Sequence, residues 1–165
     1  MKTQKLSKEI VDLLIQRIKT EYDVSYFYRS AANWCNDQGF MKAAKFFEDE
    51  SNDEITHAKI LIDFIVGWNV LFQLPPIAQP EWDFECLACI LGRAYEIELK
   101  LYEDYEDTSL KILEMGELAT FDMLQQLRKI QNESVIMFSD KLNLLEGTNT
   151  KDKFQMLMLE DKLFG

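Results

Sequence analysis

The sequence predicts an all-α protein, a bundle of four long helices with one long crossover connection and a short C-terminal fifth helix. Apolar residues recur every three to four positions over four long segments, which is the period of an amphipathic helix. The 165 residues include only 6 Gly and 3 Pro, and all three prolines fall between the second and third segments. Because glycine and proline interrupt helices, their positions mark the connections of the bundle.

The first two segments predict a helical hairpin. Ser7 suits the N-cap of a helix over residues 8–38, and Gly39 supplies its stop. A second helix is predicted over residues 41–65 and ends at Gly67. Because the connection at Gly39 is short, the two helices are expected to be antiparallel neighbours.

A crossover connection and a second hairpin follow. Residues 68–83 contain the three prolines, which cannot continue a helix. At about 3.3 Å per residue this connection can travel the length of the bundle, so the third helix is expected to run parallel to the second. We predict that third helix over residues 83–115, with Asp83 as a candidate N-cap and Gly116 as its stop, and a fourth helix over residues 117–145.

A turn and a short helix complete the chain. Gly147, Thr148 and Asn149 predict the turn, and residues 151–164 read as a short amphipathic helix. We therefore expect a single domain over residues 1–165, with the bundle over about 7–145.

Composition excludes several classes of function. A formal net charge of −11 repels phosphate backbones and attracts cations, so nucleic acid is not an expected partner. No stretch offers the roughly 20 uninterrupted apolar residues that a transmembrane helix needs, and the start of the sequence has no apolar signal segment. We expect a cytoplasmic protein without a membrane partner. Three cysteines are too few for a disulfide framework, and Cys86 and Cys89 are interpreted as packing residues, although a redox role stays open.

Each predicted long helix places one polar side chain in its apolar stripe. The four residues are Glu21, Glu54, Glu98 and Gln131, and His57 lies three residues after Glu54 on the same face. Their heights agree: Glu21 lies 18 residues before Gly39, and Glu54 and His57 lie 15 and 18 after it, which at about 1.5 Å per residue is one level. Glu98 and Gln131 lie 18 before and 15 after Gly116. The two hairpins thus carry matched polar groups near mid-bundle.

Buried carboxylates at this level indicate a metal site. A single glutamate on such a stripe is usually an edge residue that reaches water, and a lone histidine is usually a satisfied core residue. Three charged carboxylates in one core would each cost several kcal/mol, and two divalent ions would neutralise them. Oxygen ligands with one nitrogen suit iron or manganese. Tyr28 follows Glu21 by seven residues and is either a core residue with a bonded hydroxyl or part of the site.

These residues resemble the ferritin family over nearly the whole chain. The most similar segments are TEYDVSYFYRSAANWC, DEITHAKIL and AYEIELKL, from the first three helices. The resemblance implies a di-iron centre, in which Glu21, Glu54 and His57 match the first iron site and Glu54, Glu98 and Gln131 match the second. Tyr28 matches the tyrosine beside that centre.

Departures from related families narrow the resemblance to non-haem ferritins. Bacterioferritins carry a second Glu-x-x-His on the fourth helix, where this chain has Gln131 and Ser134, and their haem ligand would fall at Ile55, so no haem is expected. Of the glutamates that form a third iron site in several bacterial ferritins, this chain keeps only Asp53 and Glu133.

The resemblance implies a ferroxidase that oxidises Fe(II) with dioxygen or hydrogen peroxide and stores Fe(III) as a mineral. It also implies a homo-oligomeric cage of twenty-four chains, with the apolar crossover connection at the two-fold contact and the fifth helix at the four-fold axis. Two alternatives stay open: a non-catalytic storage or structural subunit, and a small di-iron oxidase or peroxidase that forms no cage.

Overall fold

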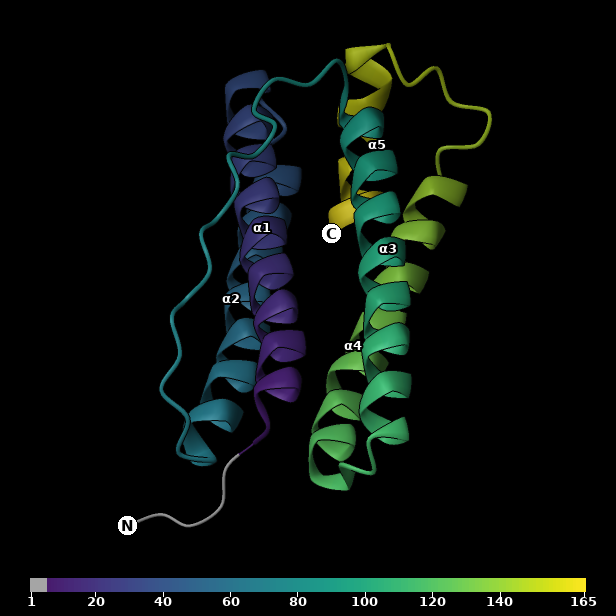
Figure 1. Cartoon of the computed structure of the whole chain (residues 1–165). Coiled ribbons are helices and arrows are strands. Elements are labelled where there is room, and N and C mark those ends of the chain that lie inside the picture. Colours follow the sequence, from purple (N-terminus) through teal and green to yellow (C-terminus); the bar gives the residue numbers. More distant parts are fainter. Residues whose placement is uncertain (1–5) are drawn as a thin grey trace.

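A computed structural model describes residues 6–165 and contains five helices and no strand over that range. The bundle consists of α1 (Lys8–Gln38), α2 (Met41–Gly67), α3 (Leu87–Glu114) and α4 (Leu118–Asn143), and it is followed by α5 (Lys153–Phe164) (Figure 1). Helix α1 packs mainly on α2 and α3 packs mainly on α4, so the bundle is two hairpins laid side by side. The predicted fold class is confirmed.

The first hairpin begins and turns where the sequence indicated. The Ser7 side chain accepts a hydrogen bond from the Ile10 amide at 3.3 Å, which satisfies one of the free donors at the start of α1. Gly39 ends the helix with φ +83°, a left-handed conformation that glycine adopts without a steric penalty.

Helix α2 has no side-chain cap of its own and is capped from α5. The Glu160 carboxylate accepts hydrogen bonds from the amides of Lys42 at 3.1 Å and Ala43 at 3.0 Å. A negative charge at a helix N-terminus is favourable because it faces unpaired amides and the positive end of the helix dipole. This contact attaches α5 to the end of the bundle where α2 begins.

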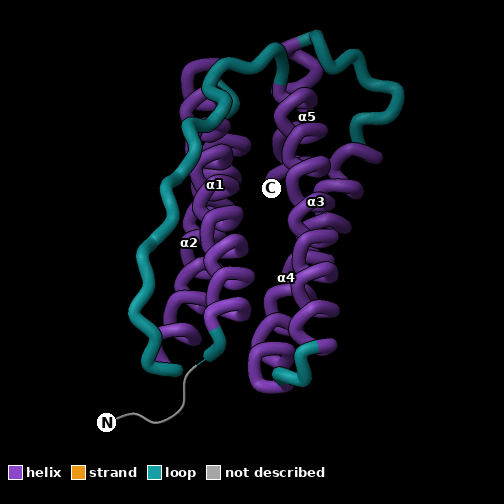
Figure 2. The backbone as a smooth tube through the Cα atoms, in the orientation of Figure 1, coloured by secondary structure: helices purple, strands orange, loops and turns teal. Residues whose placement is uncertain are grey.

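Residues 68–86 form the crossover connection, which runs along the bundle from the end of α2 to the start of α3 (Figure 2). The loop is held to α1 by Asp23, which accepts from the Ala78 amide at 2.8 Å, and by Ser30, which donates to the Glu81 carbonyl at 2.5 Å. Helix α3 consequently runs parallel to α2, as predicted. Four apolar side chains of the loop are exposed, and the most exposed are Leu71 at 99% and Trp82 at 71%.

Two details at the start of α3 correct the sequence interpretation. The helix begins at Leu87 rather than at Asp83, and Cys86 is its N-cap, with Sγ accepting from the Cys89 amide at 3.0 Å. Cys86 and Cys89 form a disulfide and Cys89 is exposed, so their interpretation as packing residues was wrong. A separation of three residues at a helix start brings the two thiols together, which the low cysteine count did not indicate. Every helix over residues 6–165 is too short or too polar to span a bilayer.

Candidate metal centre

Four helices bring polar side chains together at mid-bundle. Glu21 of α1 and Glu54 of α2 are each 1% exposed, and Glu98 of α3 and Gln131 of α4 are 0% and 2% exposed. All four lie inside the core, on the apolar stripes where the sequence pattern placed them. Three of them are carboxylates, which are rarely buried unless something pairs with them.

The first hairpin is held in register close to these residues. Ser25 Oγ donates to the Ser51 carbonyl and Ser51 Oγ donates to the Ser25 carbonyl, both at 2.8 Å and both buried. Ser25 lies one turn after Glu21, and Ser51 lies one turn before Glu54. Because the helices are antiparallel, this reciprocal pair keeps the two glutamates at the same height.

Glu21, Glu54 and His57 form the first group, with one potential ligand atom from each within 4.8 Å of the others. His57 Nδ1 lies 3.0 Å from Glu54 Oε2 and 3.8 Å from Glu21 Oε2. Burial disfavours the imidazolium, but the nearby Glu21 carboxylate outweighs this effect and raises the pKa of His57. Glu21 Oε2 is buried and has no hydrogen-bond partner within the described residues.

The pKa values of the two carboxylates of this group are shifted in opposite directions. Burial raises the pKa of Glu54 well above its usual value, and the adjacent negative charge of Glu21 raises it further. Burial acts on Glu21 in the same sense, but the interactions with Glu54 and His57 outweigh it and lower the pKa of Glu21. In the metal-free protein, therefore, Glu54 holds a proton more tightly than Glu21 does.

Glu54 also belongs to a second group, together with Glu50 and Glu98, again with ligand atoms within 4.8 Å of one another. The Glu98 carboxylate accepts hydrogen bonds from the Tyr28 hydroxyl and the Gln131 amide. Gln131 Nε2 also donates to the Glu98 carbonyl at 3.0 Å. Burial raises the pKa of Glu98 to about 7, although both side-chain hydrogen bonds act to lower it. Glu54 thus belongs to both groups of potential ligands.

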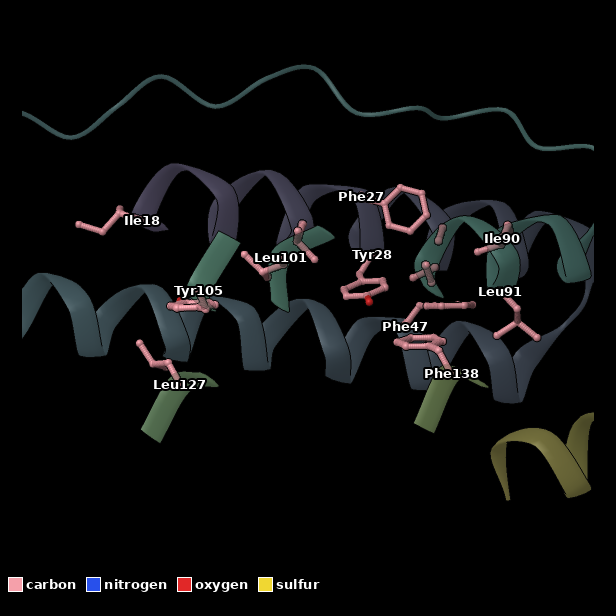
Figure 3. Packing of buried hydrophobic residues seen from close by; sticks show 14 of the residues in the cluster. Ile18, Phe27, Tyr28, Phe47, Ile90, Leu91, Leu101, Tyr105, Leu127 and Phe138 are labelled. Carbon is pink, nitrogen blue, oxygen red and sulfur yellow. The ribbon is translucent and has the colours of Figure 1, made fainter. Parts of the chain in front are cut away.

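Two tyrosines donate hydrogen bonds to Glu98 and Glu21, the carboxylates that each belong to only one of the two groups. The Tyr28 hydroxyl from α1 donates to Glu98 on α3, and the Tyr105 hydroxyl from α3 donates to Glu21 on α1. Both tyrosines are 0% exposed and lie at separate levels of the core (Figure 3). The Tyr28 ring is stacked on the rings of Phe47 and Phe138, with ring centroids 5.8 and 5.9 Å away.

Glu50 and Tyr105 were missed by sequence reasoning, although each had a signal. Glu50 precedes Glu54 by four residues, which is the next position on the same helical face. Tyr105 follows Glu98 by seven residues, as Tyr28 follows Glu21. Matching the two hairpins position by position would have found it.

The two residues considered for a third iron site lie outside the two groups of potential ligands. Asp53 and Glu133 are both exposed, and neither belongs to the two ligand groups found among residues 6–165. A third site at these positions stays a prediction.

The donor atoms can hold a pair of hard divalent cations. Carboxylate and amide oxygens with a single imidazole nitrogen are ligands that iron and manganese accept. A cation beside Glu21 Oε2 would also satisfy an atom that is buried without a partner. The chemistry of the side chains therefore fits a dinuclear centre in which Glu54 is shared.

The chain matches a family model and several known proteins. Residues 11–148 match the family model described as a ferritin-like domain. A bacterial non-heme ferritin of Campylobacter jejuni is 29% identical over 143 residues, covering 85% of this chain and 86% of the relative. A probable bacterial non-heme ferritin-like protein of Haemophilus influenzae is 28% identical over 152 residues, covering 90% and 92%. An open pore ferritin from the archaeon Archaeoglobus fulgidus has the same fold, with a TM-score of 0.90 at 21% identity over 96% of each chain.

Proposed function

Because this chain belongs to the ferritin family, we propose that it is a ferroxidase subunit that binds two Fe(II) ions, oxidises them and stores the product. The observation that carries the proposal is the shared position of Glu54 between two groups of buried ligand atoms. Glu21, Glu54 and His57 are assigned to one ion, and Glu54, Glu98 and Gln131 to the other. A shared carboxylate holds the two ions close enough to act on one oxidant.

The reaction uses two Fe(II) as substrate. Each loses one electron, and dioxygen takes up both electrons with two protons to give hydrogen peroxide, which can itself accept electrons from further Fe(II). The protein contributes placement and charge balance, because the carboxylates stabilise the higher positive charge of Fe(III). Tyr28 donates a hydrogen bond that orients Glu98. The centre needs no haem.

The product is proposed to enter a mineral inside a cage of twenty-four copies in the cytoplasm. The exposed apolar side chains of the crossover connection support association, since patches of this kind usually mark contacts between chains. The two most exposed of these side chains, Leu71 and Trp82, are the ones we expect a second copy to cover.

Rapid mixing with Fe(II) in air tests the activity. We expect Glu54→Ala to abolish fast oxidation, because the variant loses the ligand common to both ions. Glu103→Ala is the matched control, since it removes an exposed carboxylate from α3 and should leave the rate unchanged. An unaltered rate in Glu54→Ala would instead indicate a non-catalytic storage subunit.

The particle mass distinguishes the proposed cage from the remaining alternative, a small di-iron oxidase or peroxidase that forms no cage. Light scattering on the purified protein should give a particle of roughly twenty-four chains if the cage forms. A monomer or dimer that still oxidises Fe(II) would identify a small di-iron oxidase or peroxidase.

A further inference from the structure

Glu50 is a half-buried carboxylate on α2, one helical turn before Glu54. Its neighbours on the helix have cationic partners: Glu48 pairs with Arg29 at 3.0 Å, and Asp49 pairs with Lys45. No hydrogen bond or ion pair involves the Glu50 carboxylate within the described part of the chain. Glu50 is therefore unlike the solvated, paired acids around it.

Lys141 and His57 are the cationic groups that influence Glu50, and Lys141 is bound to other groups. Its ammonium donates to the Leu163 carbonyl and lies 4.5 Å from the centroid of the Phe46 ring and 5.1 Å from that of Phe164. These contacts hold the amine against α5 and the aromatic side chains. Lys141 consequently does not neutralise Glu50 by a direct ion pair.

Anions, by contrast, face Glu50 at close range. A ligand oxygen of Glu50 lies within 4.8 Å of ligand oxygens of both Glu54 and Glu98. Burial and the charges of Glu98 and Asp53 raise the pKa of Glu50 to about 7, against smaller opposing effects of Lys141 and His57. Three converging carboxylates without a cation are an unfavourable arrangement, which a bound metal ion would relieve.

The charge balance of the centre also favours a metal ion beside Glu50. Two Fe(II) ions carry four positive charges, and Glu21, Glu54 and Glu98 supply three negative ones. Helix α4 adds only neutral groups at this level, namely the Gln131 amide and the Ser134 hydroxyl, which donates back to the Ile130 carbonyl at 3.3 Å. A fourth carboxylate, from Glu50 on α2, makes the loaded centre neutral.

We propose that Glu50 is a ligand of the second metal ion, beside Glu54 and Glu98; this assignment rests on the proposed ferroxidase function. Glu50 is half-buried, whereas Glu54 and Glu98 are 1% and 0% exposed. It is thus the most exposed carboxylate of this group.

Calorimetric titration with Zn(II), a redox-inert probe, tests the assignment on the intact protein without oxidation. Wild type should bind two ions per chain. Glu50→Gln keeps the size of the side chain and removes its charge, so it should bind one ion with unchanged affinity and the other at least tenfold more weakly. Circular dichroism checks that the variant retains its helices.

Glu48→Gln is the matched control, because it makes the same change at an exposed position two residues before Glu50 on α2. We expect it to leave both affinities within about twofold of wild type. The assignment of Glu50 is overturned if Glu50→Gln binds both ions as wild type does, or if Glu48→Gln weakens the second ion equally. Wild type that binds no Zn(II) would overturn the metal centre itself, and the assignment with it.

Discussion

Replacing Glu98 with glutamine is expected to stabilise the metal-free protein at alkaline pH, although it removes a proposed metal ligand. Glu98 is 0% exposed, and burial raises its pKa from 4.5 to about 7. One pKa unit corresponds to about 1.4 kcal/mol, so ionising this carboxylate in the folded state lowers the free energy of unfolding by about 3 kcal/mol.

The sign of the pH dependence follows from the direction of the shift. Because the folded pKa of Glu98 exceeds the unfolded value, the folded protein keeps a proton that the unfolded chain has lost. The resulting loss of wild-type stability is absent at low pH, begins as pH rises through the unfolded pKa of 4.5, and is complete above the folded pKa of about 7. Glutamine does not titrate and avoids this loss.

The comparison between two pH values isolates the effect of charge. Glutamine at position 98 also disturbs the hydrogen bonds from Tyr28 and Gln131, at a cost of about 1 kcal/mol that is the same at every pH. The stability of Glu98→Gln relative to wild type should therefore be about 2.5 kcal/mol more favourable at about pH 8 than at about pH 5.

Urea unfolding followed by circular dichroism, with a chelator present and at one protein concentration, measures this difference. Glu103→Gln, on the exposed face of α3, is the control and should show no comparable change between the two pH values. If the relative stability of Glu98→Gln is the same at both, burial does not hold the proton on Glu98 and the reasoning is wrong. Added Zn(II) should reverse the order, because wild type then gains more binding free energy.

Two further substitutions test the groups that support the centre. Tyr105→Phe removes the hydroxyl that donates to Glu21, and we expect binding of the ion beside Glu21 to weaken about tenfold in a Zn(II) titration, with the other ion unaffected. Equal weakening of both ions would show a general loss of structure instead. Phe47→Ala opens a cavity beside Tyr28 in a fully buried cluster and should lower the free energy of unfolding by about 3 to 5 kcal/mol, measured in urea; a change below about 1 kcal/mol would contradict the packing described.

The fold was predictable because its signals are local. The period of the apolar residues, the cap at Ser7 and the stop at Gly39 act within single helices, and each appears in the structure as expected. Residue counts from the two turns also placed Glu21 level with Glu54, because antiparallel helices with a common rise of about 1.5 Å per residue keep their heights aligned. The predicted start of α3 was wrong for a local reason, because the Cys86 sulfur, and not the Asp83 carboxylate, accepts the capping hydrogen bond.

The sequence by itself determined the helices, their order and the four polar residues in the apolar stripes. Only the tertiary structure decided which oxygens meet: it paired Tyr28 with Glu98 and Tyr105 with Glu21, and it brought Glu50 into the second group. The physical reason is that helical periodicity specifies the direction of a side chain only to a face of its own helix. Whether two such side chains come within a few ångströms depends on the rotation and separation of packed helices, which the core as a whole determines.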